Sequence, residues 1–385
     1  MARVKIIIFL IMLFSGFSAT FAQLKESPIR VFGYFQNSFQ HWTESLDHPA
    51  YNSFALQQLN MFLQKDLAKN WTAFVNFEVL NNFSSSRRWG SFNIEEAWVR
   101  YRASRQFNLK VGLLIPTFNY LNEYKNRTPL LPYIARPLVY ETSFDEFIAI
   151  EEFLPRRAFV QAYGFIPSGK AKFDYAVYVG NSPNINDQFT NELYGEKQQT
   201  GIDTTTTFLL GGRLGLRYKE LRAGFSLTHE KTNIFIPAAE RLNEPVSKFQ
   251  ERPRVRLGAD ISYHLGDISF EGEYIGVFYD EGTETVEVDK RFLYGTLGWQ
   301  TTEQLFVYGS YWYTLEHRVE AELDSSITKY TVDTNVITGG ASYNLSDRIT
   351  LKAQVARVDV SSNLPLSLFP GTDWLVYSAA ISIFF

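Results

Sequence analysis

The residues of this sequence whose side-chain chemistry is most informative are arginines that recur at every second position. Arg252, Arg254 and Arg256 occupy one face of a period-two pattern, and Asp260 and Ser262 continue that polar face while the other face is apolar. A period of two places alternate side chains on opposite sides of a β-strand. Guanidinium groups bind carboxylates and phosphates through donors held in a fixed plane. The pattern predicts a strand with one apolar face and one face that attracts anions.

Further basic residues fall on the polar faces of other predicted strands. The basic candidates for this charged surface are Arg100, Arg102, Lys110, Arg213, Arg217, Arg222, Arg252, Arg254 and Arg256. Those from Arg213 onward belong to three consecutive strands, where like charges repel unless counterions or solutes bind between them. Two interpretations stay open. These side chains are solvated polar filling of a wet interior, or they form a surface at which anions bind.

Alternating segments of about ten to thirteen residues recur along the chain, each long enough to cross a bilayer as a tilted strand. We predict sixteen strands, at residues 30–41, 53–65, 70–80, 91–103, 106–115, 155–165, 171–180, 207–217, 220–232, 252–264, 267–279, 289–300, 304–316, 334–344, 347–358 and 374–385. Very short links rich in turn residues alternate with long links. The predicted fold class is therefore all-β, a transmembrane antiparallel up-and-down β-barrel of about 16 strands.

Charge decides which face of each predicted strand looks inward. An Arg or Lys on the lipid side at mid-membrane costs about 2–4 kcal/mol. The arginine faces should therefore line a wet interior, while Leu214, Phe225 and Leu257 face lipid. Tyr34 and Trp98 also fall on inward faces, either as ordinary filling or as a surface along which sugars slide.

The start of the chain has the features of an export signal. Arg3 and Lys5 precede an apolar run at residues 6–14, and a small-x-small cleavage pattern ends at Ala22. The apolar run is shorter than the roughly 20 residues that a helical span needs. We therefore predict a signal peptide at residues 1–22 and one barrel domain at residues 23–385.

The end of the chain also indicates an exported protein. Residues 374–385 alternate up to a terminal aromatic residue, Phe385. This resembles the last strand that outer-membrane β-barrels present to the barrel assembly machinery. We therefore expect the strands to span an outer membrane.

Composition disfavours several classes of protein. Cysteine is absent, which excludes a disulfide framework, thiol catalysis and thiolate metal sites. The formal net charge of −4 becomes −6 once the two basic residues of the signal peptide are removed, so nucleic-acid binding is disfavoured. The five histidines are scattered without metal-ligand spacing, and no nucleophile with a nearby base stands out. We predict no metal, no cofactor and no enzymatic activity.

The longest predicted link, residues 116–154, combines prolines and aromatic residues with charged side chains of both signs. Loops of this length are usually functional or disordered, and the aromatic residues argue against disorder. We expect the loop to fold into the barrel and narrow it, with an external lid as the alternative. The residues expected at this constriction are Arg127, Arg136, Tyr140, Glu141, Asp145, Glu146, Glu151 and Glu152. Acids facing the arginine wall would create a transverse field.

Three local motifs allow a family resemblance to be stated. Residues 93–102 form an acidic-Ala-aromatic run that continues into a basic strand, residues 107–112 end in Val-Gly, and residues 116–118 read Pro-Thr-Phe. Together they resemble the phosphate-selective porins of the O and P type, including relatives in Bacteroidetes-like bacteria. The position of link 116–154, between the fifth and sixth strands, is also that of the inserted loop in sixteen-stranded general porins.

The resemblance implies a homotrimer in the outer membrane of a Gram-negative bacterium. It implies passive diffusion of small hydrophilic solutes or anions, with phosphate as one candidate, and it implies that Arg100, Arg102 and the later arginines line the pore. The implied partners are the lipid bilayer, lipopolysaccharide and the barrel assembly machinery, with no nucleic acid. A closed barrel, or one for hydrophobic solutes, remains the alternative, and an outer-membrane enzyme is a further one. Sugars, dicarboxylates and peptides also suit a lining of aromatic residues and arginines.

Overall fold

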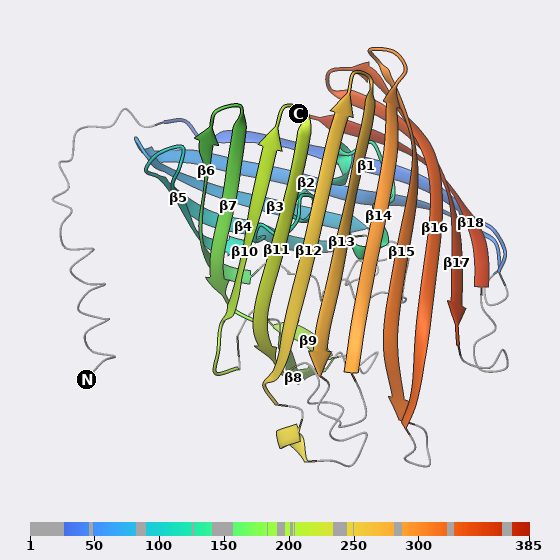
Figure 1. Cartoon of the computed structure of the whole chain (residues 1–385). Coiled ribbons are helices and arrows are strands. Elements are labelled where there is room, and N and C mark those ends of the chain that lie inside the picture. The colour runs from blue at the N-terminus through green and yellow to red at the C-terminus, as the bar shows by residue number, and fades with distance from the viewer. Residues whose placement is uncertain are drawn as a thin grey trace.

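The computed structural model describes residues 27–45, 49–81, 90–124, 127–140, 157–182, 184–190, 197–200, 203, 205–233, 245–248, 250–280, 287–321, 327–363 and 372–385. Sixteen antiparallel strands close into a barrel in which β7 pairs with β10 and the last strand pairs with the first (Figure 1). The barrel strands are β1 Arg30–Trp42, β2 Tyr51–Ala68, β3 Trp71–Asn81, β4 Ser91–Arg102, β5 Asn108–Leu114, β6 Arg157–Ser168, β7 Ala171–Gly180, β10 Leu209–Tyr218, β11 Leu221–Thr232, β12 Arg252–Leu265, β13 Ile268–Asp280, β14 Glu287–Gln300, β15 Leu305–Ala321, β16 Ile327–Ser346, β17 Ile349–Ser362 and β18 Thr372–Phe384. The predicted all-β barrel of sixteen strands is confirmed.

Alternation along each strand separates the two faces of the barrel wall. In β12, Arg254 and Arg256 are buried on the inner face, whereas Ile261 and Tyr263 on the outer face are more than two-fifths exposed. Leu214 of β10 is 69% exposed on the same outer surface. Apolar side chains exposed on the outside of the barrel suit contact with lipid. Closure of the barrel also leaves no strand edge with unpaired backbone groups, as a lipid environment requires.

The barrel closes between its first and last strands. Tyr34 of β1 is paired with Phe384 of β18. Beyond β18, the amide of Phe385 donates to the carbonyl of Gly33 at 3.0 Å, and the Gly33 amide donates back at 2.9 Å. The C-terminal aromatic residue therefore belongs to the seam of the barrel.

Two predicted links contain strand structure. β15 and β16 extend to Ala321 and from Ile327, so the predicted link 317–333 is mostly a long hairpin. The alternating residues before Val332 favour a strand, and the sequence interpretation placed the strand boundary too late. The predicted link 181–206 contains β8 (Asn184–Thr190) and β9 (Lys197–Thr200), which form a separate two-stranded sheet.

Helical structure in the described ranges is limited to short 3-10 turns. These are η1 Leu121–Glu123, η2 Thr128–Leu130, η3 Leu138–Tyr140 and η5 Val246–Lys248. No helix in these ranges is long and apolar enough to cross a membrane. Turns η1 to η3 belong to the link between β5 and β6.

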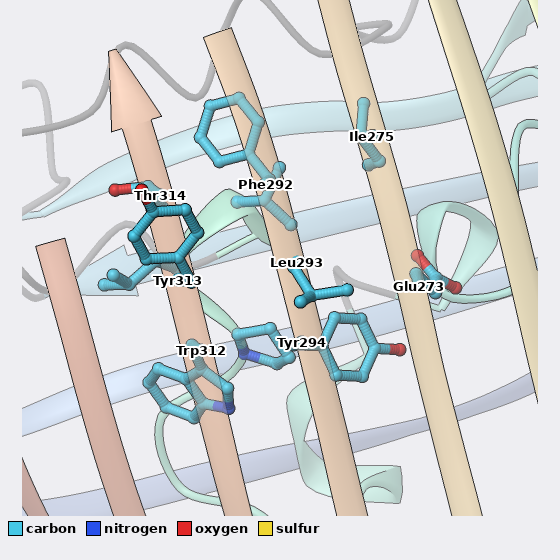
Figure 2. A pocket seen from close by; sticks show the side chains of 11 residues that line it. Glu273, Ile275, Phe292, Leu293, Tyr294, Trp312, Tyr313 and Thr314 are labelled. Carbon is cyan, nitrogen blue, oxygen red and sulfur yellow. The ribbon is translucent and has the colours of Figure 1, made fainter. Parts of the chain in front are cut away.

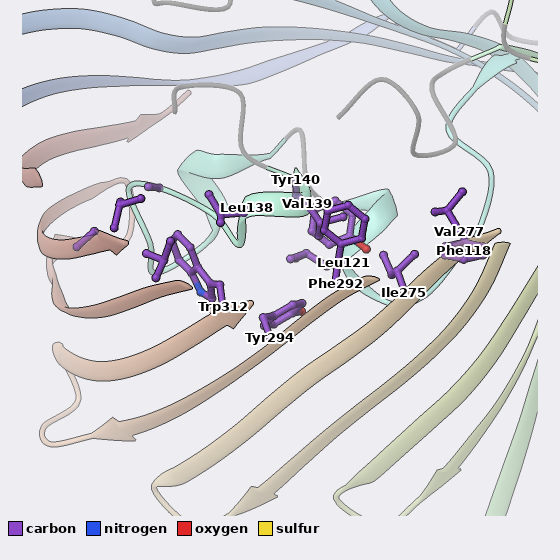
Figure 3. Packing of buried hydrophobic residues seen from close by; sticks show 14 of the residues in the cluster. Phe118, Leu121, Leu138, Val139, Tyr140, Ile275, Val277, Phe292, Tyr294 and Trp312 are labelled. Atoms are coloured by element: carbon purple, nitrogen blue, oxygen red, sulfur yellow. The ribbon is translucent and has the colours of Figure 1, made fainter. Parts of the chain in front are cut away.

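Part of the barrel interior is an apolar core. Leu121, Leu138 and Tyr140 of the link pack in one cluster with inward-facing side chains of the wall (Figure 3). The wall contributes Phe292 and Tyr294 of β14, Trp312 of β15, Val336 of β16, Val358 of β17 and Val376 of β18. Burial of such aromatic and aliphatic surfaces is favourable, so it holds the described part of the link against the inner wall.

Candidate functional site

The link between β5 and β6 is first fixed against β11, β12 and β13. The amide of Asn119 donates to Ser226 Oγ at 2.9 Å, and its side-chain Nδ2 donates to the carbonyl of Tyr274 at 3.2 Å. A Cβ atom built at Gly258 would overlap Asn119 Oδ1 and would lie 2.8 Å from the ring of Phe118. Asn119 has a φ of +49°, a left-handed conformation that Asn tolerates better than most residues. Gly258 therefore provides the space in which the link meets the wall.

Glu273 of β13 holds two separate points of the same link. One carboxylate oxygen accepts from the Leu121 amide at 2.6 Å, and the other accepts from the Tyr140 hydroxyl at 2.7 Å. Burial, together with the neighbouring carboxylate, raises the pKa of Tyr140 well above its ordinary value, so the hydroxyl keeps the proton that it donates. The adjacent inward residue, Glu271, accepts from Tyr133.

A third set of contacts comes from β17. Lys352 is buried, and its Nζ donates to the carbonyls of Thr128 at 3.0 Å and Pro129 at 3.2 Å. Two positions further along, Gln354 Oε1 accepts from the Ile134 amide at 2.8 Å. These bonds are charge-assisted or buried, which makes them costly to lose. The described part of the link is thus fixed to the wall at points far apart around the barrel.

The apolar side of this link leaves almost no free volume. Figure 2 shows the side chains that line this region, with the Tyr294 ring beside Glu273 and with Phe292 and Trp312 on the far side of Tyr294. The cavity between these residues and residues 137–139 measures about 10 Å³, close to the minimum that holds one water molecule. By contrast, residues 129–132 line a cavity of about 650 Å³ at the barrel end that carries the short turns. Space for a solute is therefore distributed unevenly inside the barrel.

Arg213 of β10 lies flat against the inner wall between two carboxylates. Its Nη1 contacts Asp174 Oδ2 at 2.6 Å, and its Nη2 contacts Asp260 Oδ1 at 2.6 Å. Gly215 and Gly224 are cross-strand partners, and a Cβ atom on either would collide with this group of charged atoms. The two glycines therefore make room for the guanidinium group, and the two acids balance its charge.

Other predicted basic residues are also paired with acids of the wall. Arg217 Nε contacts Asp174 Oδ1 at 2.9 Å. Arg254 and Arg256 contact one oxygen of Glu230 at 2.5 and 2.7 Å, and all three side chains are fully buried. Part of the repulsion expected within the arginine cluster is thus relieved by carboxylates of β7, β11 and β12.

A second group of cations lies against aromatic rings. Lys110 Nζ is 4.8 Å from the ring centre of Trp98 and 5.6 Å from that of Tyr163. The Arg100 guanidinium is 5.9 Å from Trp98, and Arg222 is 5.8 Å from Tyr120. Cations over ring faces are attracted by the ring quadrupole. These cations therefore lie inside the barrel against aromatic rings.

The strand registers place all nine predicted basic residues on the inner face: Arg100, Arg102, Lys110, Arg213, Arg217, Arg222, Arg252, Arg254 and Arg256. Arg102 is exposed near a short turn. In the link, Arg136 is buried and Arg127 contacts Glu96 at 3.7 Å. Five of the predicted constriction residues lie outside the described residues, namely Glu141, Asp145, Glu146, Glu151 and Glu152.

The sequence interpretation did not identify Asp174, Tyr163, Asn119 or Lys352. Asp174 and Tyr163 could have been found, because alternation along their predicted strands places both on the inner face. Asn119 lies in a link without alternation, and Lys352 resembles the other polar residues of its inner face, because the importance of both depends on a link and a wall far apart in the sequence. The described residues contain no group of three or more His, Asp or Glu side chains that could hold a metal ion.

Comparison with protein families matches residues 162–363, about half of the sequence, to the Gram-negative porins. The chain belongs to the Gram-negative porin family. A search of curated proteins finds no match for this porin. The family and the fold indicate a channel rather than an enzyme, and they support a location in the outer membrane.

Solved structures show the same fold at low sequence identity. An anion-selective porin from Comamonas acidovorans is 14% identical, with 94% of this chain and 100% of that chain covered and a TM-score of 0.61. OmpF of Salmonella typhi, in complex with daunomycin, is 13% identical over 93% and 97% of the chains, with a TM-score of 0.55. OmpT of Vibrio cholerae in a trimer form is 8% identical over 93% and 99%, also with a TM-score of 0.55. At these identities the likeness establishes the fold alone.

Proposed function

We propose that this porin is a passive channel for small hydrophilic solutes with a preference for anions. The observation that carries the proposal is the charge of the inner wall between β5 and β10. Its described side chains include four cations, Lys110, Lys172, Arg213 and Arg217, and one carboxylate, Asp174. An excess of fixed positive charge along a wet wall raises the local concentration of anions.

The link 116–154 would narrow this path. Residues 116–124 and 127–140 are fixed to the inner wall by the contacts of Asn119, Glu273 and Lys352. Residues 137–139 leave almost no space against β13 to β15, and we propose that a solute passes on the side of the basic wall. The acids in the rest of the link would then face the basic wall across the path and create a transverse field. Small ions of opposite sign would follow separate routes through it.

Phosphate is one candidate among the anions, on the basis of the resemblance to phosphate-selective porins. The name of the Comamonas acidovorans neighbour agrees with anion preference in general. A homotrimer agrees with the trimer form of the Vibrio cholerae neighbour. We further propose that residues 1–22 are removed as a signal peptide. Insertion by the barrel assembly machinery and contact with lipopolysaccharide would follow from the outer-membrane location.

The test is the reversal potential of the purified mature protein in planar bilayers under a KCl gradient, together with its single-channel conductance. Anion preference predicts open channels whose reversal potential has the sign of chloride permeation, and phosphate should reduce the chloride current. The double variant Lys110→Met/Arg217→Met should shift the reversal potential toward the potassium value. The matched control, Lys170→Met/Lys219→Met, removes two charges from short turns and should leave it unchanged.

Two outcomes would contradict the proposal. Potassium-preferring channels would mean that the acids of the link control the path. Absence of conductance from correctly folded protein would favour a closed barrel.

A further inference from the structure

Two like charges lie directly opposite each other on the inner wall. Arg100 of β4 and Lys110 of β5 are cross-strand partners, and both side chains point into the barrel. Like charges at directly opposed positions destabilise a sheet. Arg217 of β10 is likewise opposite Lys172 and Arg222, but its Nε contacts the carboxylate of Asp174 at 2.9 Å.

Arg100 and Lys110 have no such carboxylate within the described part of the chain. Arg100 Nη2 donates a long hydrogen bond of 3.4 Å to Thr72 Oγ1, and its buried Nε has no hydrogen-bond partner. Lys110 contacts the rings of Trp98 and Tyr163. The buried Nε and the two like charges together mark a place where a bound anion would be stabilised.

The nearest acid on the same strand is directed elsewhere. Glu96 accepts from Trp98 Nε1 at 3.1 Å and contacts Arg127 Nη2 at 3.7 Å. The Trp98 ring is also stacked with Phe74, with their centres 4.8 Å apart and their planes at 21°. The ring beside the two cations is therefore held rigidly before any solute arrives.

The rings decide which anion would be preferred. Inorganic phosphate would gain the two positive charges but would lose part of its hydration against Trp98 and Tyr163 without compensation. A carboxylate attached to an aromatic ring would bridge the cations and bury apolar surface against those rings. We infer that Arg100, Lys110, Trp98 and Tyr163 form a binding station for small aromatic carboxylates inside this porin. As a statement about the transported solutes, the inference rests on the proposed function.

Benzoate, acetate and phosphate are the probes for this station. Binding of labelled benzoate to the folded, detergent-solubilised protein is measured by equilibrium dialysis, and block of the chloride current is measured in bilayers. We expect benzoate to bind and block more strongly than acetate, and acetate to differ little from phosphate. Lys110→Met should weaken benzoate binding about tenfold, as expected for loss of a charged hydrogen-bond donor. Trp98→Leu should weaken it about threefold, as expected for loss of an aromatic contact.

Lys170→Met is the matched control. It removes the same charge from an exposed short turn and should leave benzoate binding unchanged. Equal binding of the three anions, or equal losses in Lys110→Met and Lys170→Met, would overturn the station while leaving an anion-preferring channel intact. Benzoate binding with the expected variant pattern but without conductance would support the station and overturn the channel. Retention of each barrel on unheated gels shows that the variants are folded.

Discussion

Asn119 occupies the space that a side chain at position 258 would need. Its Oδ1 atom lies where a Cβ atom of residue 258 would be, and its amide is bonded to Ser226 on the neighbouring strand. The link between β5 and β6 thus packs against the inner wall in the space that the missing side chain of Gly258 leaves. Gly258 therefore controls how closely the link approaches the wall.

Gly258→Ala should displace Asn119 and its hydrogen bonds. Overpacking of this kind typically costs about 1–3 kcal/mol, so the thermal unfolding temperature should fall and single-channel conductance should change. Gly309→Ala is the control, because a Cβ atom there would have its nearest neighbour 3.9 Å away. Equal unfolding temperatures and conductances of the two variants would show that the contact between Asn119 and Gly258 is unimportant.

Asp174→Asn should increase chloride preference. The substitution keeps the shape of the side chain but removes the negative charge that contacts both Arg213 and Arg217. We expect the chloride-to-potassium permeability ratio to rise about two- to threefold, because one fixed charge is removed from the wall. The measurement is the reversal potential, with Asp267→Asn in an exposed turn as the control. An unchanged ratio in Asp174→Asn would place the wall outside the ion path.

Lys352→Met should loosen the link without removing it. The carbonyls of Thr128 and Pro129 would lose a hydrogen-bond donor in a buried site, a cost of about 1–3 kcal/mol. We expect a lower unfolding temperature and more frequent closures or current noise in single-channel records. Lys170→Met, in an exposed turn, should show neither effect. A quiet channel of normal stability in Lys352→Met would contradict this role.

Glu251 gives one contact between loops a predictable pH dependence. Hydrogen bonds from the hydroxyl and amide of Thr206 lower the pKa of Glu251 below its ordinary value of 4.5, and a bond from Lys231 adds to this. Since the folded pKa is the lower one, the stabilisation is present above pH 4.5 and is lost as the pH falls through the lowered value. Deuterium exchange of residues 205–207, measured by mass spectrometry and corrected for the intrinsic rate, should accelerate over this range. Glu251→Gln should exchange fast at every pH, and a persistent pH step in that variant would rule out Glu251 as its cause.

Much of the wall could be predicted from the sequence because alternation is a local property. The pattern around Arg254 and Arg256 predicts a strand and its inner face with no knowledge of neighbours. The prediction ends the first strand of the hairpin formed by β15 and β16 at residue 316, because charged residues such as Arg318 and Glu320 are equally compatible with a loop. Strand boundaries are thus less certain than the faces of strands.

The partners of the basic residues could not be predicted in the same way. Pairing of Arg213 with Asp260 depends on the registers of three strands, and a shift of one residue in any of them would separate the two side chains. Lys352 looks like any other polar residue on an inner face until the carbonyls of Thr128 and Pro129 are placed beside it. Long-range geometry, rather than residue type, turns such positions into a site.

The anchoring of the link has a consequence for the order of assembly. Lys352 Nζ contacts Gln36 Oε1 of β1 at 2.8 Å as well as the carbonyls of the link, and the same Gln36 oxygen accepts from Ser382 of β18. The seat for the link is therefore built from the first strand and the last two strands, and it exists only after these have met. The link can therefore stabilise the seam from inside the barrel only after the wall has closed. An unfinished barrel would lack this anchor, so the link would reach its final position only when the seam closes.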